Sequence, residues 1–465
     1  MTSMLLADIA ARLSSAATPE AVMEATLAQI RAVNGEVNAL VSLRSEADLL
    51  AEARGAREGP LAGVPVAIKD LANAEGLPTS MGSPLFAGQV AVEDDLFVAR
   101  MRAAGAIVIG KSNTPEFGLG SHTVNPVHGA TRNAYDPALS AGGSSGGAAV
   151  ALATGMLEIA DGSDMMGSLR NPAGWANVYG MRPTFGLVPG ARKGDTFLNM
   201  LATNGPMARS PKGLAQLLEV QAGPDPMQPH GRGLFRAEDV EPRTGRIGWL
   251  GDWGGAYPME AGVLATCEAA LDEMRRAGFE VVEMAAPFDA GALWRSWICL
   301  RSWAVAGALG PLYDDPEMRA ALKPAAIWEI ERGRALSAAE VHAASVIRSD
   351  WFARAAGLFD EVDALALPTA QCWPFDVDLV HPTGIAGVAM DTYHRWMEVV
   401  IPASLIGLPA IAVPAGFGTN GLPVGLQLVG RQGSDAALIG MAEMWHRATG
   451  WPDARPPEMP SAQGA

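Results

Sequence analysis

Short apolar segments alternate with longer segments of helical periodicity along much of the chain. Six apolar runs are bounded by Gly or Pro, and each predicts a strand buried on both faces: residues 63–70, 105–113, 246–253, 278–284, 362–370 and 408–417. Residues 261–277 have a helical pattern and connect the third of these runs to the fourth, which predicts a βαβ unit. The whole pattern predicts the α/β fold class, with a large mixed β-sheet covered by helices on both faces.

The amino-terminal part of the chain is predicted to be helical. Met4, Leu5 and Ile9 recur at helical spacing, and Thr18-Pro19-Glu20 provides a helix N-cap followed by Pro at the first helical position. No charge block, Pro-rich tract or internal repeat divides the remaining chain. We therefore expect a helical segment over residues 1–60 and a single α/β domain over residues 61–465.

Two segments could be taken for membrane or targeting sequences, but neither has the required pattern. Residues 399–430 carry no charge and are long enough to span a bilayer, but four prolines and several glycines would leave their backbone unsatisfied in lipid. We expect buried strands joined by turns there. The amino terminus has no Lys or Arg before Arg12 and no continuous apolar run, so it does not have the pattern of a signal peptide.

Composition limits the partners and the compartment. With 34 basic and 50 acidic side chains, the net charge is −16, which disfavours binding to nucleic acid or to an anionic membrane. The three cysteines are odd in number, widely separated and lack metal-binding spacing. We therefore expect a cytoplasmic protein without a disulfide framework or a metal site.

Two glycine-rich segments carry candidate nucleophiles. In Gly142-Gly143-Ser144-Ser145-Gly146-Gly147, each serine fits the G-x-S-x-G spacing of a nucleophile turn, although such a run also suits a flexible loop. A second segment, "ADGSDMMGSLRNPAGW", places Ser168 after Gly167. None of the seven histidines lies in a context that marks a catalytic residue, so a Ser-His-Asp arrangement is left open without support. Lys69 follows the apolar part of the strand predicted at 63–70, where a salt bridge with Asp70 or Asp164 is the ordinary alternative to catalysis.

Several motifs together resemble those of the amidase signature family, in content and in order. They are "GVPVAIKD", "TSMGS", "GKSNTPEFG", "GGSSGGAAVALATG", "GSDMMGSLRNP" and "LPAIAVPAGF" followed by "GLPVGLQLVG". The match is strong over residues 60–190 and 400–431 and vague between them. Residues 164–172 are most similar to the branch of nylon-oligomer hydrolases and urethane-cleaving amidases.

The resemblance implies a Ser-Ser-Lys triad and no cofactor. Ser168 would be the nucleophile, Ser144 the bridging serine after a cis peptide bond, and Lys69 the base. The chemistry agrees: a serine hydroxyl needs a neighbouring group to take its proton, and a lysine amine can do so when burial lowers its pKa. Ser144 can accept one proton while donating another, because a hydroxyl is both donor and acceptor. Ser145 is expected to form local hydrogen bonds only.

The resemblance also implies an oxyanion hole made by the backbone N–H groups of Met165, Met166, Gly167 and Ser168. The family commonly has two glycines before the nucleophile, whereas this chain has Met166-Gly167. A methionine at positive φ would be strained, so either the backbone at Met166 suits an L-residue or the hole is remodelled. Two thioethers beside the site would make its wall apolar. Asp164 and Arg170 are expected to pair and brace this loop; direct contact of Arg170 with substrate is the weaker interpretation.

The resemblance also implies a variable region over about residues 285–400, and we expect this region to form the pocket. Trp294, Trp297 and Trp303 lie there and suit either a pocket wall or the packing of a helical core. Cys299 in the same region suits a small buried apolar residue better than a functional thiol.

We therefore expect an amide hydrolase that acts on carbon–nitrogen bonds other than peptide bonds and forms a Ser168 acyl-enzyme. Its expected substrate is a neutral small-molecule amide or carbamate. A homodimer is left open. Three alternatives stay open: the amidase-like component of a tRNA-dependent amidotransferase, a catalytically inactive binding protein on this fold, and, more distantly, a Ser-His-Asp esterase on an α/β-hydrolase fold. Retention of Lys69, Ser144 and Ser168 argues against the binding protein, and Met165-Met166 against the amidotransferase component.

Overall fold

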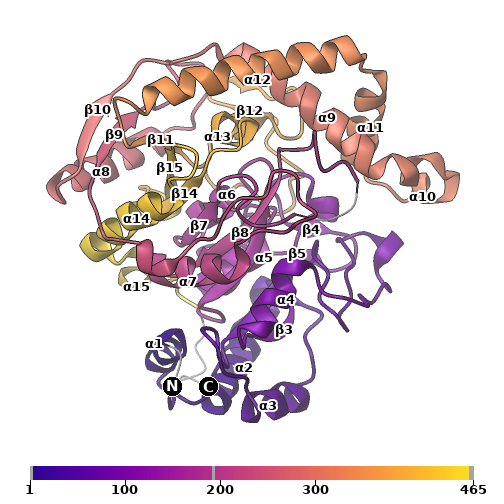
Figure 1. Ribbon diagram of the computed structural model, residues 1–465, viewed down its shortest axis with the longest axis vertical. Helices are drawn as coiled ribbons and strands as arrows, with labels where there is room; N and C mark the ends of the chain where they lie inside the picture. Colours follow the sequence, from indigo (N-terminus) through magenta and orange to yellow (C-terminus); the bar gives the residue numbers. More distant parts are fainter. Residues whose placement is uncertain (1–3, 191–193, 460–465) are drawn as a thin grey trace.

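The computed structural model describes residues 4–190 and 194–459. An eight-stranded mixed sheet forms its centre (Figure 1), with the strand order β10-β9-β11-β15-β14-β7-β8-β6. Strands β10, β9 and β11 are parallel, and every later pair in this order is antiparallel. The strands are β6 Ile159–Asp164, β7 Tyr179–Arg182, β8 Thr203–Ala208, β9 Arg246–Trp249, β10 Glu280–Glu283, β11 Ala364–Pro368, β14 Ala410–Phe417 and β15 Pro423–Gly430. The predicted α/β class with a mixed sheet is confirmed.

Helices cover both faces of this sheet, as predicted. On one face pack α7 (Pro211–Gln221), α8 (Val263–Arg276) and α14 (Asp435–Thr449), and on the other α5 (Gly146–Ala153) and α6 (Arg170–Trp175). Strand β14 shows why both faces need a cover: Ile411 and Val413 join one apolar cluster, whereas Ala410 and Ala412 join the clusters of the opposite face. The βαβ unit formed by β9, α8 and β10 is confirmed as well.

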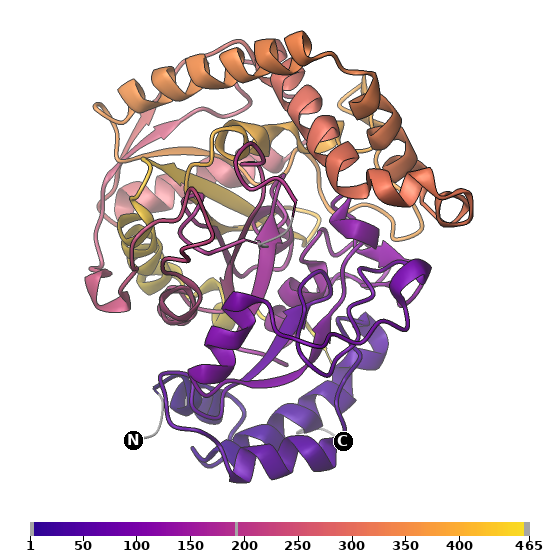
Figure 2. The same ribbon diagram turned by 45° about the vertical axis from the view of Figure 1, so that its right-hand side comes forward.

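A second, three-stranded sheet carries the predicted lysine. Its strand order is β1-β3-β2, with β1 Leu40–Val41, β2 Pro65–Lys69 and β3 Ile107–Ser112. Strand β2 lies beside β6, the edge of the large sheet. Figures 1 and 2 show the amino-terminal helices around this small sheet: α1 Met4–Arg12, α2 Pro19–Val37, α3 Glu46–Arg54 and α4 Leu96–Ala103. The predicted N-cap is confirmed, because the Thr18 side chain accepts a hydrogen bond from the Ala21 N–H.

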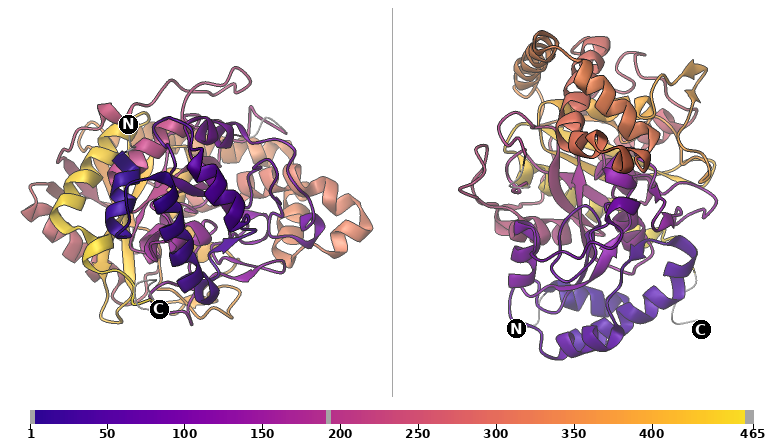
Figure 3. Two further views of the ribbon diagram at one scale, coloured as in Figure 1. Left: turned by 90° about the horizontal axis from the view of Figure 1, so that it is seen from below. Right: turned by 90° about the vertical axis from the view of Figure 1, so that its right-hand side faces the viewer.

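A group of helices lies beyond the opposite end of the sheet, at the top of Figure 1 and in both views of Figure 3. It contains α9 Ala290–Asp314, α10 Pro316–Ala320, α11 Pro324–Ala335 and α12 Ala338–Leu358. Two short hairpins (β4 Val124–Asn125 with β5 Gly129–Ala130, and β12 Gly384–Ile385 with β13 Val388–Ala389) and α15 (Trp451–Ala454) complete the main elements. The division into residues 1–60 and 61–465 stays a prediction.

Two predictions about strands were wrong. Strand β10 is partly exposed rather than buried on both faces, because it is the edge strand of the large sheet. Residues 395–405 form a 3₁₀ helix (Arg395–Val400) and helix α13 (Ile401–Leu405), so the uncharged segment begins with helix and only then continues as β14 and β15. None of the helices in the described ranges is long and apolar enough to cross a membrane. All three cysteines are buried free thiols.

Candidate active site

Lys69 ends β2 in a buried position among serine hydroxyls. The residue is 1% exposed. The amine lies 2.8 Å from the hydroxyl oxygens of both Ser144 and Ser145 and 3.1 Å from that of Ser163. Three short contacts to groups that can accept as well as donate allow the amine to pass a proton in either direction.

Within the described ranges, the Lys69 amine has no direct ion-pair partner. Burial lowers the pKa of Lys69 to about 7, although the negative charges of Asp161 and Asp164 raise it in part. Among the described residues, no carboxylate oxygen lies within 4.0 Å of the amine. The salt-bridge interpretation is therefore wrong: Asp70 lies 3.8 Å from Lys111, and Asp164 pairs with arginines. An amine with this pKa is largely neutral just above pH 7, as a general base must be.

The two adjacent serines have different surroundings. A cis peptide bond joins Gly143 to Ser144, as the resemblance implied. The Ser145 hydroxyl is enclosed against β6, because a Cβ atom added at Gly162 would lie 2.7 Å from it. Ser144 belongs to the slightly exposed part of the site, with 3% exposure against 0% for Ser145. The environment therefore suits Ser145 for local hydrogen bonding and Ser144 for contact with a reacting group.

Ser168 lies on the loop between β6 and α6, directly beside the glycine-rich segment. Its carbonyl accepts a hydrogen bond of 3.2 Å from the N–H of Ser145, which joins the loop to the glycine-rich segment. The residue is 6% exposed. The structure therefore brings Lys69, Ser144 and Ser168 into one region from three separate elements.

The backbone before Ser168 accommodates the unusual methionine. The left-handed position is Gly167, with φ of 77°, whereas Met166 is not among the residues with positive φ. Gly167 also packs against Val400, whose side chain would lie 2.8 Å from an added Cβ atom. Met166 is buried and belongs to an apolar cluster, and Met165 lies at its edge. A glycine is thus required at position 167 and not at 166, because only the former has a left-handed backbone.

Asp164 holds this loop in place through a buried network. Its carboxylate accepts hydrogen bonds from the N–H groups of Gly167 (2.9 Å) and Leu169 (3.3 Å). Arg170 lies 3.0 Å away and Arg182 3.2 Å away. Burial alone would raise the pKa of Asp164, but the two guanidinium groups lower it well below its ordinary value. The expected pairing of Asp164 with Arg170 is present, and Arg170 is fully buried rather than facing a cavity.

Sequence reasoning missed two polar residues of β6. Ser163 contacts the Lys69 amine, and the Asp161 carboxylate accepts the backbone N–H of Lys69 at 2.8 Å. Positions 161 and 163 lie on one face of the strand, because side chains alternate along it. Polar residues at alternate positions of an otherwise buried strand were the signal that could have found them.

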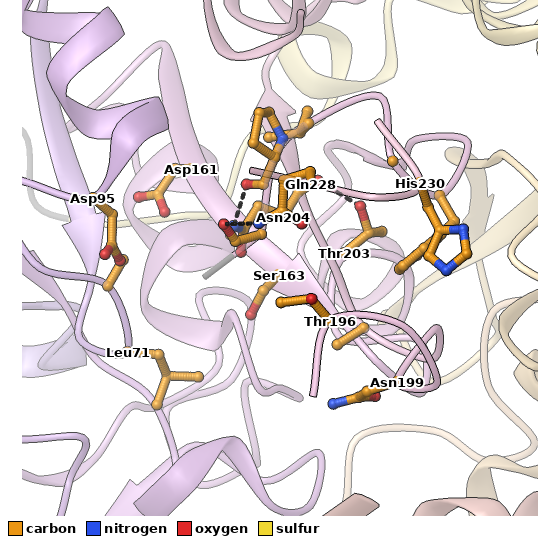
Figure 4. Close-up of a pocket in the computed structure, with 18 of the residues that line it drawn as sticks. Leu71, Asp95, Asp161, Ser163, Thr196, Asn199, Thr203, Asn204, Gln228 and His230 are labelled. Atoms are coloured by element: carbon orange, nitrogen blue, oxygen red, sulfur yellow. Dashed lines mark hydrogen bonds between the residues drawn. The ribbon is translucent and has the colours of Figure 1, made fainter. Parts of the chain in front are cut away.

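One cavity borders the site directly, whereas the wall of a second contains none of Lys69, Ser144 and Ser168. The first, of about 300 Å³, has Lys69 in its wall. Asp161 and Ser163 of β6, and Thr203 and Asn204 of β8, line it as well (Figure 4). Figure 4 shows the side chains of Asp161 and Ser163 on the same side of this cavity, opposite His230.

The other cavity, of about 520 Å³, lies between the segment 119–124 and the helical region. Trp328, Tyr393 and Trp396 line it. Trp294 and Trp297 instead pack in an apolar cluster, so for these two the core interpretation is correct. Cys299 belongs to the same cluster, as expected for a small buried apolar residue.

The sequence also matches a known family. The model of the family described as Amidase covers residues 21–439. The chain belongs to the amidase family. Amidases hydrolyse amide bonds, so the expected class of enzyme, a hydrolase of carbon–nitrogen bonds other than peptide bonds, is confirmed.

Three relatives place this amidase more closely. An acylamidase of Rhodococcus erythropolis is 32% identical over 94% of each chain. A glutamyl-tRNA(Gln) amidotransferase subunit of Thermus thermophilus is 35% identical, over 96% of this amidase and 97% of the relative. The solved structure of 6-aminohexanoate cyclic dimer hydrolase with its substrate superimposes with a TM-score of 0.86 at 25% identity, over 97% and 98% of the two chains. The resemblance to the nylon-oligomer branch is thereby supported.

Proposed function

We propose that this amidase cleaves small-molecule amides through an acyl-enzyme on Ser168. The observation that carries the proposal is the buried Lys69 amine, which has a pKa of about 7 and lies 2.8 Å from the Ser144 hydroxyl. In the proposed first step, Ser168 attacks the substrate carbonyl and passes its proton to Ser144, while Ser144 passes its own proton to Lys69. The proton on Lys69 then returns through Ser144 to the departing amine, and water releases the acyl group.

The tetrahedral intermediate needs hydrogen-bond donors for its negatively charged oxygen. We assign this role to the backbone N–H groups of Met165, Met166 and Ser168. The N–H of Gly167 was also expected to contribute, but it already donates to Asp164 at 2.9 Å. Gly167 therefore supports the hole through its left-handed backbone, and Asp164 keeps the loop in the shape that presents the other donors.

We propose the 520 Å³ cavity as the substrate pocket. Its wall runs from Gly120 and Ser121, and an added Cβ atom at Gly143, beside the cis bond, would lie 3.3 Å from the Cα atom of Ser121. Most of the wall is apolar and aromatic, which favours neutral amides or carbamates with an aryl or alkyl group. The hydroxyls of Ser121 and Thr392, which line the cavity, are buried and have no partner within the described residues, so they suit a polar atom of the substrate.

The amidotransferase alternative rests on the 35% identity to the Thermus thermophilus protein. An enzyme of that kind would release ammonia from glutamine and depend on partner chains for this. Assays of the isolated chain with glutamine and with neutral anilides separate the two, because the proposed function requires anilide hydrolysis without any partner. The expected cytoplasmic location, the homodimer and the cleavage of carbamates stay predictions.

Mass spectrometry with a fluorophosphonate tests the assignment of the nucleophile. Wild-type enzyme is expected to gain one adduct, and Ser168→Ala to gain none and to lose hydrolysis at least about a thousandfold. Ser349→Ala, which changes an exposed serine of α12, serves as the matched control and should behave as wild type. An adduct that persists in Ser168→Ala and disappears in Ser144→Ala would overturn the assignment. Full activity of Ser168→Ala would overturn the mechanism.

A further inference from the structure

Strands β2 and β6 lie side by side, and a side chain, that of Asp161, connects them. Strand β2 pairs with β3 through its backbone, and β6 pairs with β8. The two strands lie side by side in different sheets, and the described residues form no ladder between them. The Asp161 carboxylate accepts the Lys69 N–H at 2.8 Å instead. The residue that carries the amine is thus fixed to the large sheet by this carboxylate.

Asp161 also differs from the other acidic residue that acts on Lys69. Two arginines match the charge of Asp164. Asp161 is 1% exposed, and no cationic side chain of the described residues lies within 4.0 Å of it. Lys111 acts on Asp161 through its charge, but its amine contacts the Asp70 carboxylate at 3.8 Å and donates to the carbonyl of Ala72. Asp161 therefore has no direct ion-pair partner among the described residues, and its charge acts on both Lys111 and the Lys69 amine.

We propose that Asp161 is a positioning residue for catalysis: its carboxylate holds the Lys69 end of β2 against β6, and its negative charge stabilises the protonated Lys69 amine. This inference rests on the proposed role of Lys69 as the base. Asp161, Ser163 and Lys69 share the wall of the 300 Å³ cavity. Figure 4 shows the side chains of Asp161 and Ser163 there.

Several other charged groups lie around Asp161 and Lys69. Burial raises the pKa of Asp161 to about 6, Lys111 and Lys69 lower it, and Asp95 raises it. Lys69 responds to Asp161 first and to Asp164 second among the charged groups. The carboxylate is therefore ionised in the pH range in which Lys69 becomes neutral. The charged groups that face the pair from the neighbouring elements are Asp70, Asp95, Lys111, Asp164, Asp195 and His230.

The substitution Asp161→Asn tests the effect of charge, since the amide oxygen can still accept the Lys69 N–H. We expect a folded, active enzyme in which the acidic limb of kcat/KM moves to lower pH by about 1 unit, because a nearby negative charge no longer stabilises the protonated amine. Asp272→Asn, which removes an exposed carboxylate on α8 (61% side-chain exposure), is the control and should leave the limb in place. A profile of Asp161→Asn that coincides with wild type would overturn the proposed effect on the proton affinity.

The substitution Asp161→Ala tests positioning, since it removes the acceptor as well. We expect kcat to fall at least about tenfold below that of Asp161→Asn at every pH, because the Lys69 N–H loses its partner. Equal kcat for the two folded variants, as judged by circular dichroism and thermal unfolding, would overturn the positioning role. Failure of the proposed function is distinguishable, because it would appear as activity in Ser168→Ala, whatever Asp161 does.

Discussion

Asp164→Asn is expected to weaken both the fold and the nucleophile loop. The carboxylate accepts five hydrogen bonds: from Gly167 (2.9 Å), from Leu169 (3.3 Å), from two nitrogens of Arg170 (3.0 and 3.1 Å) and from Arg182 (3.2 Å). An asparagine keeps one acceptor oxygen and turns an NH₂ group toward donors. About two charge-assisted bonds are then lost, each contributing about 1.5–3 kcal/mol. Two fully buried guanidinium groups also lose their anion, which costs about 3–5 kcal/mol in comparable buried pairs.

These two estimates describe the same loss in the free energy of unfolding. We therefore expect Asp164→Asn to lower it by about 4 kcal/mol. Urea unfolding at pH 7.5, followed by tryptophan fluorescence, measures this free energy. Asp272→Asn removes one partner of an exposed ion pair and is expected to cost at most about 0.5 kcal/mol. We also expect a lower kcat for Asp164→Asn in the absence of urea, because Gly167 and Leu169 lose their acceptor. A loss of less than about 1 kcal/mol would refute the reasoning that this anion organises the buried arginines.

Three further predictions concern the base, the core and the pocket. Below a pH of about 7, kcat/KM for a neutral anilide should fall about tenfold per pH unit, since protonated Lys69 cannot accept a proton; a flat profile down to pH 5.5 would contradict this. Gly174→Ala should destabilise the protein by about 2 kcal/mol or more in urea unfolding, because its Cβ atom would lie 2.2 Å from the Thr369 hydroxyl and 2.9 Å from backbone of β15, whereas Gly307→Ala, in open space on α9, should be neutral or slightly stabilising. Thr392→Val should raise KM several-fold with little change in kcat, because the variant lacks the hydroxyl proposed to bind substrate. An unchanged KM would show that this hydroxyl does not bind substrate.

The strands that carry the site could be predicted because their signals are local. Apolar runs bounded by Gly or Pro located β2, β3 and β14, and the charged end of the first run made Lys69 a candidate. A glycine-rich segment made Ser168 a candidate. Helical periodicity found α8 for the same reason: each signal is contained within about four residues of the chain. The exception, β10, shows the limit, because an apolar run does not reveal whether its strand lies at the centre or the edge of a sheet.

The state of each site residue depended on tertiary packing. The order of the motifs indicated that Lys69, Ser144 and Ser168 act together, but sequence alone left a salt bridge for Lys69 open. Packing decided against it, since Asp70 lies near Lys111 and Asp164 lies between two arginines. It likewise placed Asp161 on the Lys69 N–H across 92 residues. Contacts of this length, and the burial that shifts a pKa, exist only once separate elements pack together, because no short segment of sequence contains both partners.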